Sequence, residues 1–223
     1  MSQKKLPTVD TYAVIYNKIK GLSVILYGEP GIGKSYFCAN LCRKAYELTQ
    51  RRALYIALDE NLKTDYGKQL RRIANAEWKE IEGYSDLWVY IATQLALDAT
   101  EKSIVIIDSL TAVQEEVISK LTGPEDPRLT MIMSRFATLV SKTVARIAHK
   151  LNIPVIIITH PTTLFRQSPI WETNMKPAFM GRAMKNIDLV VEYFITQKGK
   201  RVLKVRLFRD VDKKPPFDYI YID

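Results

Sequence analysis

The segment that most constrains the fold is Gly28-Glu29-Pro30-Gly31-Ile32-Gly33-Lys34-Ser35, which fits the pattern G-x-x-x-x-G-K-S. It follows the apolar run Val24–Tyr27 and precedes a helical pattern that extends to about Leu48. Strand, glycine-rich loop and helix form the context that a phosphate-binding loop requires. Backbone N–H groups of such a loop and the N-terminus of its helix together create an anion site. We therefore predict that the chain binds a nucleoside triphosphate, the alternative being a glycine-rich turn that fits the pattern by chance.

Residues of this loop have separate predicted roles. Lys34 can reach the β- and γ-phosphates, and the Ser35 hydroxyl can ligate Mg²⁺. The predicted cofactors are accordingly ATP and Mg²⁺. The residues expected to contact the nucleotide are Gly28, Glu29, Pro30, Gly31, Ile32, Gly33, Lys34, Ser35 and Tyr36.

Length and composition set broad limits. With 223 residues, 47% of them hydrophobic, the chain is long enough for one α/β domain with a real core. We expect a polar arm and short helix over 1–20 and the domain itself over 21–223. The polar N-terminus carries no secretory signal and no apolar run is long enough to span a bilayer, so a cytoplasmic protein without membrane contact is predicted. Cys38 and Cys42 are interpreted as small core residues, with no disulfide and no metal cluster.

Charge favours a polyanionic partner. The formal net charge is +9 and the isoelectric point is near 9.4. Such a balance is typical of proteins that bind nucleic acid, but it is also compatible with solubility alone.

Strand-like and helix-like segments alternate along the chain, which predicts a mostly parallel twisted sheet flanked by helices. The segment 119–128, with Gly123, Pro124 and Pro127, is predicted to be a loop. The segment 162–180 shows no helical or strand period and is too long for a simple connector. The last two strands are expected to form an antiparallel hairpin at the sheet edge. Predicted strands are 22–27, 53–58, 87–92, 103–109, 155–159, 189–195, 202–209 and 218–222; predicted helices are 9–19, the one after the phosphate loop, 64–81 (with Tyr66 toward the core), 94–100 and 129–151.

Polar residues end three of these strands: Asp59-Glu60, Asp108-Ser109 and Thr159-His160. Ligands of parallel α/β sheets bind at the carboxyl ends of the strands, so these residues should lie beside Lys34. Asp108 ends the most continuous apolar run and is predicted to help hold Mg²⁺. An aspartate that merely starts a turn is the alternative.

The ordered set of motifs resembles the RecA/RadA/KaiC family of P-loop ATPases, and in type the small archaeal RadA paralogs that consist of the ATPase core alone. The resemblance covers roughly 20–223. Its motifs are Gly28–Ser35, Tyr55–Glu60, Ile104–Leu110, Pro154–His160 and Pro177–Gly181.

The resemblance implies a water-activating carboxylate after the second strand, a position that Glu60 and Asp59 match. Neighbouring side chains on an extended segment point opposite ways, so one of the two should face the γ-phosphate, and Glu60 is preferred over Asp59. It also implies a γ-phosphate sensor at His160, where the family often has glutamine. A core histidine with a satisfied hydrogen bond is the alternative for His160.

Lys204-Val205-Arg206 resembles a Lys-x-Arg pair that reaches the neighbouring subunit's nucleotide in KaiC-like proteins. Lys204 and Arg206 share a strand face and would then act as a finger in trans, which implies a homo-oligomer. The alternative is an edge strand whose basic residues face solvent.

The resemblance further implies single-stranded DNA, and a recombinase or another repair protein, as partners. DNA-binding candidates in the second loop are Arg166, Trp171, Lys176 and Arg182, since cations and aromatic rings together hold single strands. No helix-hairpin-helix domain is visible in 1–20, which favours an accessory role over strand exchange. A KaiC-like switch acting on protein partners is the alternative function, and a P-loop kinase of small substrates explains the motifs less well.

Overall fold

The computed structural model describes residues 10–120, 127–163, 175–177, 181–210 and 212–222. An eight-stranded sheet in the order β10-β9-β8-β1-β5-β4-β2-β3 forms its centre. The strands from β8 to β3 run parallel, whereas β9 is antiparallel to both its neighbours. The strands of this sheet are β1 (Ser23–Tyr27), β2 (Ala53–Ala57), β3 (Ala76–Glu80), β4 (Val105–Asp108), β5 (Val155–Thr159), β8 (Leu189–Ile195), β9 (Arg201–Phe208) and β10 (Tyr219–Ile222). The predicted α/β architecture with C-terminal antiparallel strands is confirmed.

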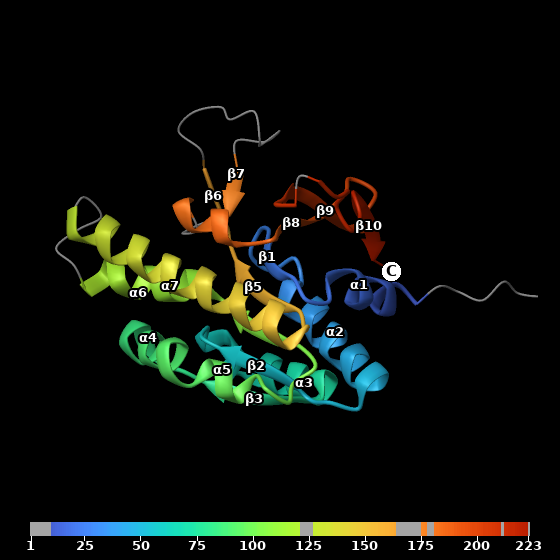
Figure 1. The fold of residues 1–223 in the computed structure, drawn as a ribbon, viewed down its shortest axis with the longest axis horizontal. Coiled ribbons are helices and arrows are strands. Elements are labelled where there is room, and N and C mark those ends of the chain that lie inside the picture. Colours follow the sequence, from blue (N-terminus) through green and yellow to red (C-terminus); the bar gives the residue numbers. More distant parts are fainter. Residues whose placement is uncertain (1–9, 121–126, 164–174, 178–180, 211, 223) are drawn as a thin grey trace, which may run out of the picture.

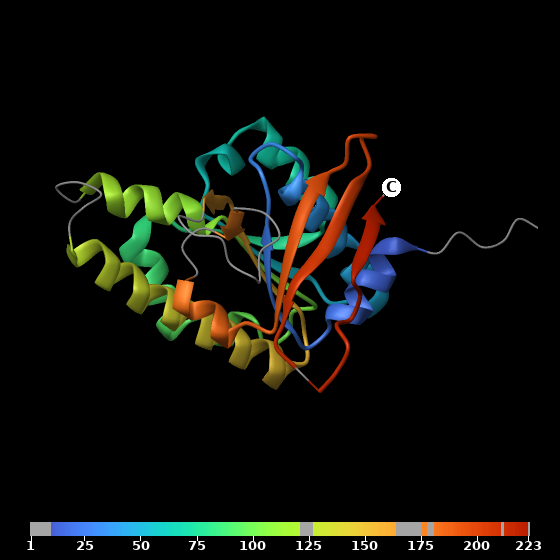
Figure 2. The same cartoon turned by 90° about the horizontal axis from the view of Figure 1, so that it is seen from above.

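Helices cover both faces of the sheet, as Figures 1 and 2 show from two directions. One hydrophobic cluster lies under α1, α2 and α3, and the other under α4, α6 and α7. Among the helices that the structure describes, none combines the length and apolar character needed to cross a bilayer. The helices are α1 (Thr11–Ile19), α2 (Lys34–Thr49), α3 (Asp65–Ala74), α4 (Gly83–Thr93), α5 (Leu95–Asp98), α6 (Leu110–Lys120) and α7 (Pro127–Leu151), with 3₁₀ segments η1 (Glu60–Lys63) and η2 (Gly181–Asn186).

Central strands are apolar throughout because both of their faces are covered. Every residue of β1, β2, β4 and β5 is buried. The register places Ile25 of β1 opposite Ile157 of β5, and Ile157 opposite Ile107 of β4. Continuous burial of this kind is the signature of a parallel sheet between two helical layers.

Two sequence predictions about the far edge of the sheet are wrong. The expected helix 64–81 ends at Ala74, because Asn75 adopts a left-handed conformation (φ 47°), and the chain continues as edge strand β3. Trp78 of β3 pairs with Tyr55 of β2 instead of facing a helical core.

The expected strand 87–92 is part of helix α4, whose Leu87, Tyr90 and Ile91 are buried. A short apolar run is compatible with a strand or with a helix, and this one forms a helix that packs against α7.

A small second sheet comes after β5. It consists of β6 (Pro161–Thr163) and β7 (Met175–Pro177), which pair antiparallel. These strands lie inside the segment 162–180 for which no period was found. In Figure 1 they lie beyond the end of β5, and β7 also contacts β1.

Gly67 fixes the junction between η1 and α3. A Cβ atom at this position would lie 1.7 Å from the backbone oxygen of Leu62. No side chain fits there without movement of the backbone. The close approach holds the segment after β2 against α3, at the edge of the sheet where the polar strand ends meet.

We expect Gly67→Ala to lower the free energy of unfolding by about 2 kcal/mol, since the clash with the backbone outweighs the gain in helix propensity. Urea unfolding followed by circular dichroism measures the loss. Lys68→Ala on the same helix is the control and should change stability by less than about 0.5 kcal/mol, because Lys68 is exposed. A Gly67→Ala variant as stable as the wild-type protein would contradict the packing of this junction.

Candidate nucleotide-binding site

The polar strand ends meet in one cavity of about 450 Å³ at the carboxyl edge of the sheet. It is formed by the loop after β1, the segment after β2, and the ends of β4 and β5. Its lining residues are Pro30, Gly31, Gly33, Lys34, Ser35, Asp59, Leu62, Thr64, Tyr66, Asp108, Ile158 and His160. Motifs far apart in the sequence therefore surround a common space.

The phosphate-loop segment has the geometry of an anion site. Gly33 is the N-cap residue of α2 and has φ 97°, a left-handed conformation that glycine adopts without strain. No side chain caps this helix end. The first N–H groups of α2 therefore point past Gly33 with the positive end of the helix dipole behind them.

Lys34 lies at the base of this loop with 5% of its surface exposed. Its Nζ atom donates to the backbone oxygens of Gly28 and Glu29, both at 2.7 Å. Burial lowers the pKa of Lys34 to about 8, against the opposing effect of Asp108 and Glu29. The ammonium group is thus held in the cavity wall by carbonyl groups that phosphate oxygens could replace.

Asp108 ends β4 and is almost completely buried, with 3% exposure. Burial raises the pKa of this carboxyl, and hydrogen bonds from Tyr55 and Ser35 oppose that rise. The Tyr55 hydroxyl donates to Asp108 Oδ2 at 2.6 Å. Asp108 and Ser35, predicted from distant motifs, therefore line the same cavity.

Ser35 and Asp108 fit the requirements of Mg²⁺. Both supply hard oxygen atoms to the same cavity. In the described part of the chain no group of three or more His, Cys, Asp or Glu side chains could hold a metal by itself. Mg²⁺ in nucleotide sites typically uses one or two protein oxygens and completes its shell with waters and phosphates, so this sparse donor set suits it.

Asp59 is the acid after β2 that the structure places in the cavity lining. Its backbone oxygen accepts from Leu62 N at 3.0 Å, at the start of η1. The side chain of Glu60, which the sequence favours, lies outside the described residues. The choice between Asp59 and Glu60 remains a prediction.

His160 also lines the cavity, at the end of β5. Burial, and secondly the charge of Lys34, lowers the pKa of His160, so the neutral imidazole prevails near pH 7. Its backbone N–H donates to Thr111 Oγ1 at 2.9 Å. The structure thus gives His160 both a place in the cavity and a link to α6 through Thr111.

Tyr66 and Thr111 are residues of this region that the sequence did not single out. Tyr66 of α3 was expected in the core, yet its side chain is 43% exposed and lines the cavity. Burial and then the charge of Asp108 raise the pKa of the Tyr66 hydroxyl. Thr111 is buried, and its hydroxyl lies 3.3 Å from that of Thr159. Thr111 directly follows the motif Ile104–Leu110, and this position was the available signal.

Arg206 and Lys204 lie on β9, outside the described cavity lining. Arg206 Nε donates to Glu192 Oε2 of β8 at 2.6 Å, and both side chains are largely buried. Glu192 is in turn paired in register with Tyr27, the last residue before the phosphate loop. In the single chain Arg206 serves an internal contact, and the finger role in trans stays a prediction.

Of the DNA-binding candidates, Lys176 lies in β7 opposite Thr162 of β6. Arg166 and Trp171 lie outside the described residues, as does the side chain of Arg182. Since β6 starts directly after His160, a single peptide bond joins this strand to the cavity wall.

Comparison with known proteins agrees with this geometry. The AAA_24 family model, described as an AAA domain, matches residues 20–214. The chain belongs to this AAA domain family. No curated protein sequence matches the chain.

The fold of this AAA domain is RecA-like. A crystal structure of the RadB recombinase superposes with a TM-score of 0.59 over 91% of this chain and 87% of that chain, at 17% sequence identity. The predicted RecA-like fold is therefore confirmed, and the family that the chain belongs to is that of the AAA domain.

The buried position of Lys34 predicts a pH dependence of nucleotide binding. With a pKa of about 8, Lys34 is charged at pH 7 and loses its proton as the pH rises through 8. Phosphate binding requires the ammonium form, so the affinity should be level from pH 6.5 to 7.5 and then fall by up to about tenfold per pH unit. Titration of a fluorescent ATP analogue between pH 6.5 and 9.5 measures this profile.

Lys68→Ala, which removes an exposed lysine, is the control and should reproduce the wild-type profile. An affinity that stays constant up to pH 9.5 would show that Lys34 keeps its proton.

Proposed function

We propose that this AAA domain binds ATP with Mg²⁺ in the cavity, hydrolyses it, and acts in DNA recombination or repair as a RadA paralog. In that role its nucleotide state would modulate contact with single-stranded DNA or with a recombinase. The observation that carries the proposal is the convergence of Lys34, Ser35, Asp59, Asp108 and His160 on one cavity. The fold shared with the RadB recombinase supports the recombination context.

Binding would rest on the anion site before α2. The uncapped N–H groups of the helix and the Lys34 ammonium would hold the phosphates. Ser35 and Asp108 would hold Mg²⁺, which supplies positive charge at the β- and γ-phosphate oxygens.

Hydrolysis needs a carboxylate near the γ-phosphate. Asp59, or Glu60 next to it, would accept a hydrogen bond from the attacking water and orient its oxygen toward the γ-phosphorus. The bond from that phosphorus to the bridging oxygen breaks, ADP leaves, and the proton of the water passes to solvent through the carboxylate. His160, neutral near pH 7, can donate a hydrogen bond to a γ-phosphate oxygen.

Coupling to a partner would pass through β6. The backbone of His160 is held by Thr111, and the next residue begins the β6–β7 pair, from which the loop with the DNA-binding candidates emerges. A change at the γ-phosphate would thereby shift the base of that loop.

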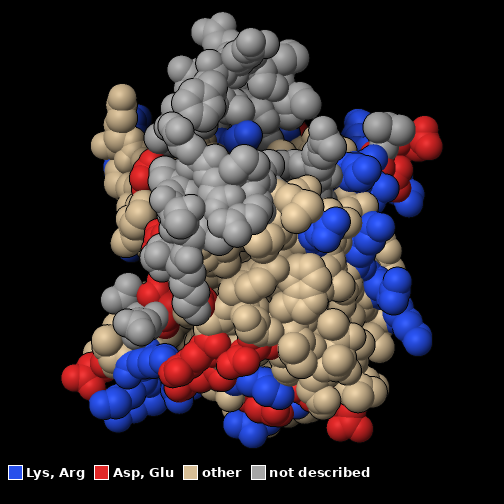
Figure 3. Space-filling view, turned by 90° about the vertical axis from the view of Figure 1, so that its left-hand side faces the viewer, with Lys and Arg blue, Asp and Glu red and all other residues tan. Residues whose placement is uncertain are grey.

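The net charge of +9 supports a polyanionic partner. On the face shown in Figure 3, basic side chains run down the right-hand margin, and basic and acidic side chains lie side by side along the lower edge.

Self-association would complete the site if Lys204 and Arg206 act in trans. Arg206 would then have to exchange its buried contact with Glu192 for a phosphate of the neighbouring subunit. Such an exchange predicts slow turnover in the isolated monomer.

The second candidate function is a KaiC-like switch that acts on protein partners. The adjacent acids Asp59 and Glu60 and the Lys-x-Arg pair also suit this function.

Two conservative variants identify the catalytic carboxylate. The substitution that removes the base, Asp59→Asn or Glu60→Gln, should leave the affinity for ATP within about twofold and slow hydrolysis by about 10²-fold or more. The other variant serves as its control and should keep near-normal turnover. Phosphate release with matched nucleotide titrations measures both. Full activity in both variants would contradict general-base catalysis by Asp59 or Glu60. In the same nucleotide titrations, Lys34→Ala should abolish binding.

A salt-titrated ATPase assay tests the DNA part. We expect single-stranded DNA to raise turnover and its affinity to fall steeply between about 50 and 200 mM salt, because phosphate contacts release counterions. Lys176→Glu should weaken DNA binding and leave basal turnover intact, with the exposed Lys68→Glu as control. Turnover indifferent to DNA, together with ATP-dependent capture of a purified recombinase, would favour the protein-partner switch instead.

A further inference from the structure

A tyrosine beneath the cavity contacts the predicted magnesium ligand. Tyr55 lies in the middle of β2 and is 0% exposed. The β2–β4 register pairs Ala57 with Asp108, so Tyr55, two residues earlier on the same face, reaches that carboxylate diagonally. Its hydroxyl donates to Asp108 Oδ2 at 2.6 Å.

The tyrosine ring is itself held in place. Trp78 of β3 stacks on it with a centroid distance of 4.0 Å and an interplanar angle of 17°. The guanidinium of Arg71 lies over the Trp78 ring, 5.2 Å from its centroid. Because aromatic rings packed between strands have little rotational freedom, the hydroxyl has one position from which to donate.

This contact limits the orientations of the Asp108 side chain. A carboxylate at the end of a strand can turn about two side-chain torsions, and only some orientations present an oxygen to the cavity. The bond from the Tyr55 hydroxyl fixes one oxygen of the carboxylate, and Ser35 of the phosphate loop lines the same cavity as Asp108. Partners of metal ligands commonly act in this way, by fixing the direction of the ligand atoms.

We propose that Tyr55 is a positioning residue that orients the Asp108 carboxylate for the Mg²⁺–nucleotide complex. The inference rests on the proposed function, because it concerns the same cavity. A purely structural explanation is that a buried hydroxyl needs an acceptor and finds one in Asp108. The two explanations differ in what the loss of the hydroxyl does to magnesium binding.

The test is Tyr55→Phe, which keeps the ring and its stacking on Trp78 and removes only the hydroxyl. Affinity for a fluorescent, non-hydrolysable ATP analogue is measured first in EDTA and then across a Mg²⁺ titration. We expect affinity in EDTA within about twofold of wild type, since the phosphate loop is intact. The Mg²⁺ concentration for half-maximal enhancement should rise by about tenfold.

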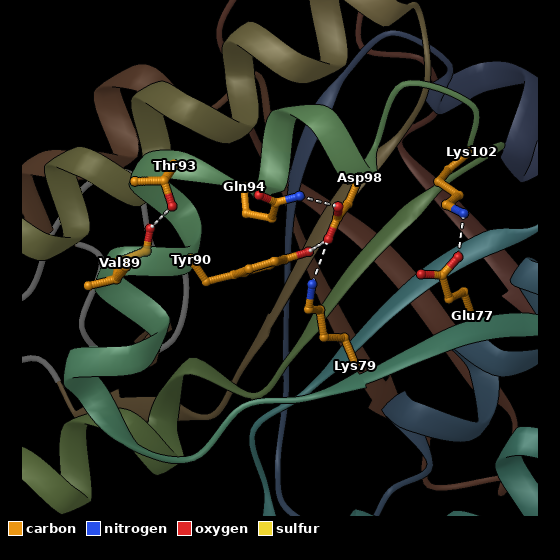
Figure 4. A network of polar contacts seen from close by, with 8 residues as sticks. All are labelled: Glu77, Lys79, Val89, Tyr90, Thr93, Gln94, Asp98 and Lys102. Carbon is orange, nitrogen blue, oxygen red and sulfur yellow. Dashed lines mark hydrogen bonds and ion pairs between the residues drawn. The ribbon is translucent and has the colours of Figure 1, made fainter.

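Tyr90→Phe is a matched control. Tyr90 of α4 is also a buried tyrosine that donates to an aspartate, Asp98 Oδ2, at 2.8 Å. Figure 4 shows this contact within a network in which Lys79 and Gln94 also donate to Asp98. None of these residues belongs to the cavity lining. Tyr90→Phe should lose stability without changing the Mg²⁺ titration.

Trp78→Leu is a second variant that retains the hydroxyl but removes the ring that holds Tyr55 in place. We expect a smaller loss of Mg²⁺ affinity in the same direction, and this variant decides the question if Tyr55→Phe does not fold. A Mg²⁺ titration of Tyr55→Phe that matches wild type, with Trp78→Leu also unchanged, would overturn the positioning role and leave the proposed function standing. A wild-type protein whose nucleotide affinity does not respond to Mg²⁺ would overturn the proposed function itself.

Discussion

The burial of two opposite charges in the wall of one cavity is the constraint on which the site depends. Lys34 and Asp108 are 5% and 3% exposed, at the end of an apolar sheet where an isolated charge is costly. Each is accommodated by directed hydrogen bonds: Lys34 donates to carbonyl groups of the phosphate loop, and Asp108 accepts from the hydroxyl group of Tyr55. The loop, the floor of β2 and the end of β4 must therefore keep their relative positions for either charge to remain inside.

The same arrangement connects the cavity to the rest of the molecule. Thr111 holds the backbone at His160, so the start of α6 and the end of β5 are joined at the point where β6 begins. Arg206 and Glu192 join β9 to β8 beside Tyr27, directly below the phosphate loop. A nucleotide in the cavity would thus touch elements that lead toward the β6–β7 loop on one side and toward the C-terminal strands on the other.

Much of the fold was predictable because its strongest signals are local. Continuous apolar runs identified β1, β2, β4, β5 and β8, and the spacing of the phosphate loop identified the turn and the helix after β1. The edge of the sheet was not predictable in the same way. Trp78 fits a helical stripe that starts at Tyr66, and only the left-handed turn at Asn75 and the pairing with Tyr55 make it part of a strand. In α4 the apolar run from Leu87 was compatible with strand or helix until α7 covered it.

By itself, the sequence determined the class of protein and the chemistry of its strand ends, since G-x-x-x-x-G-K-S and the acids after apolar runs are encoded by neighbouring residues. Tertiary structure decided how those ends face one another. It placed Asp59 and Tyr66 in the cavity lining, gave Arg206 an internal partner, and brought Tyr55 under Asp108. These outcomes depend on strand order, register and the turn after β2, which are set by packing between segments far apart in the chain and have no counterpart in local spacing.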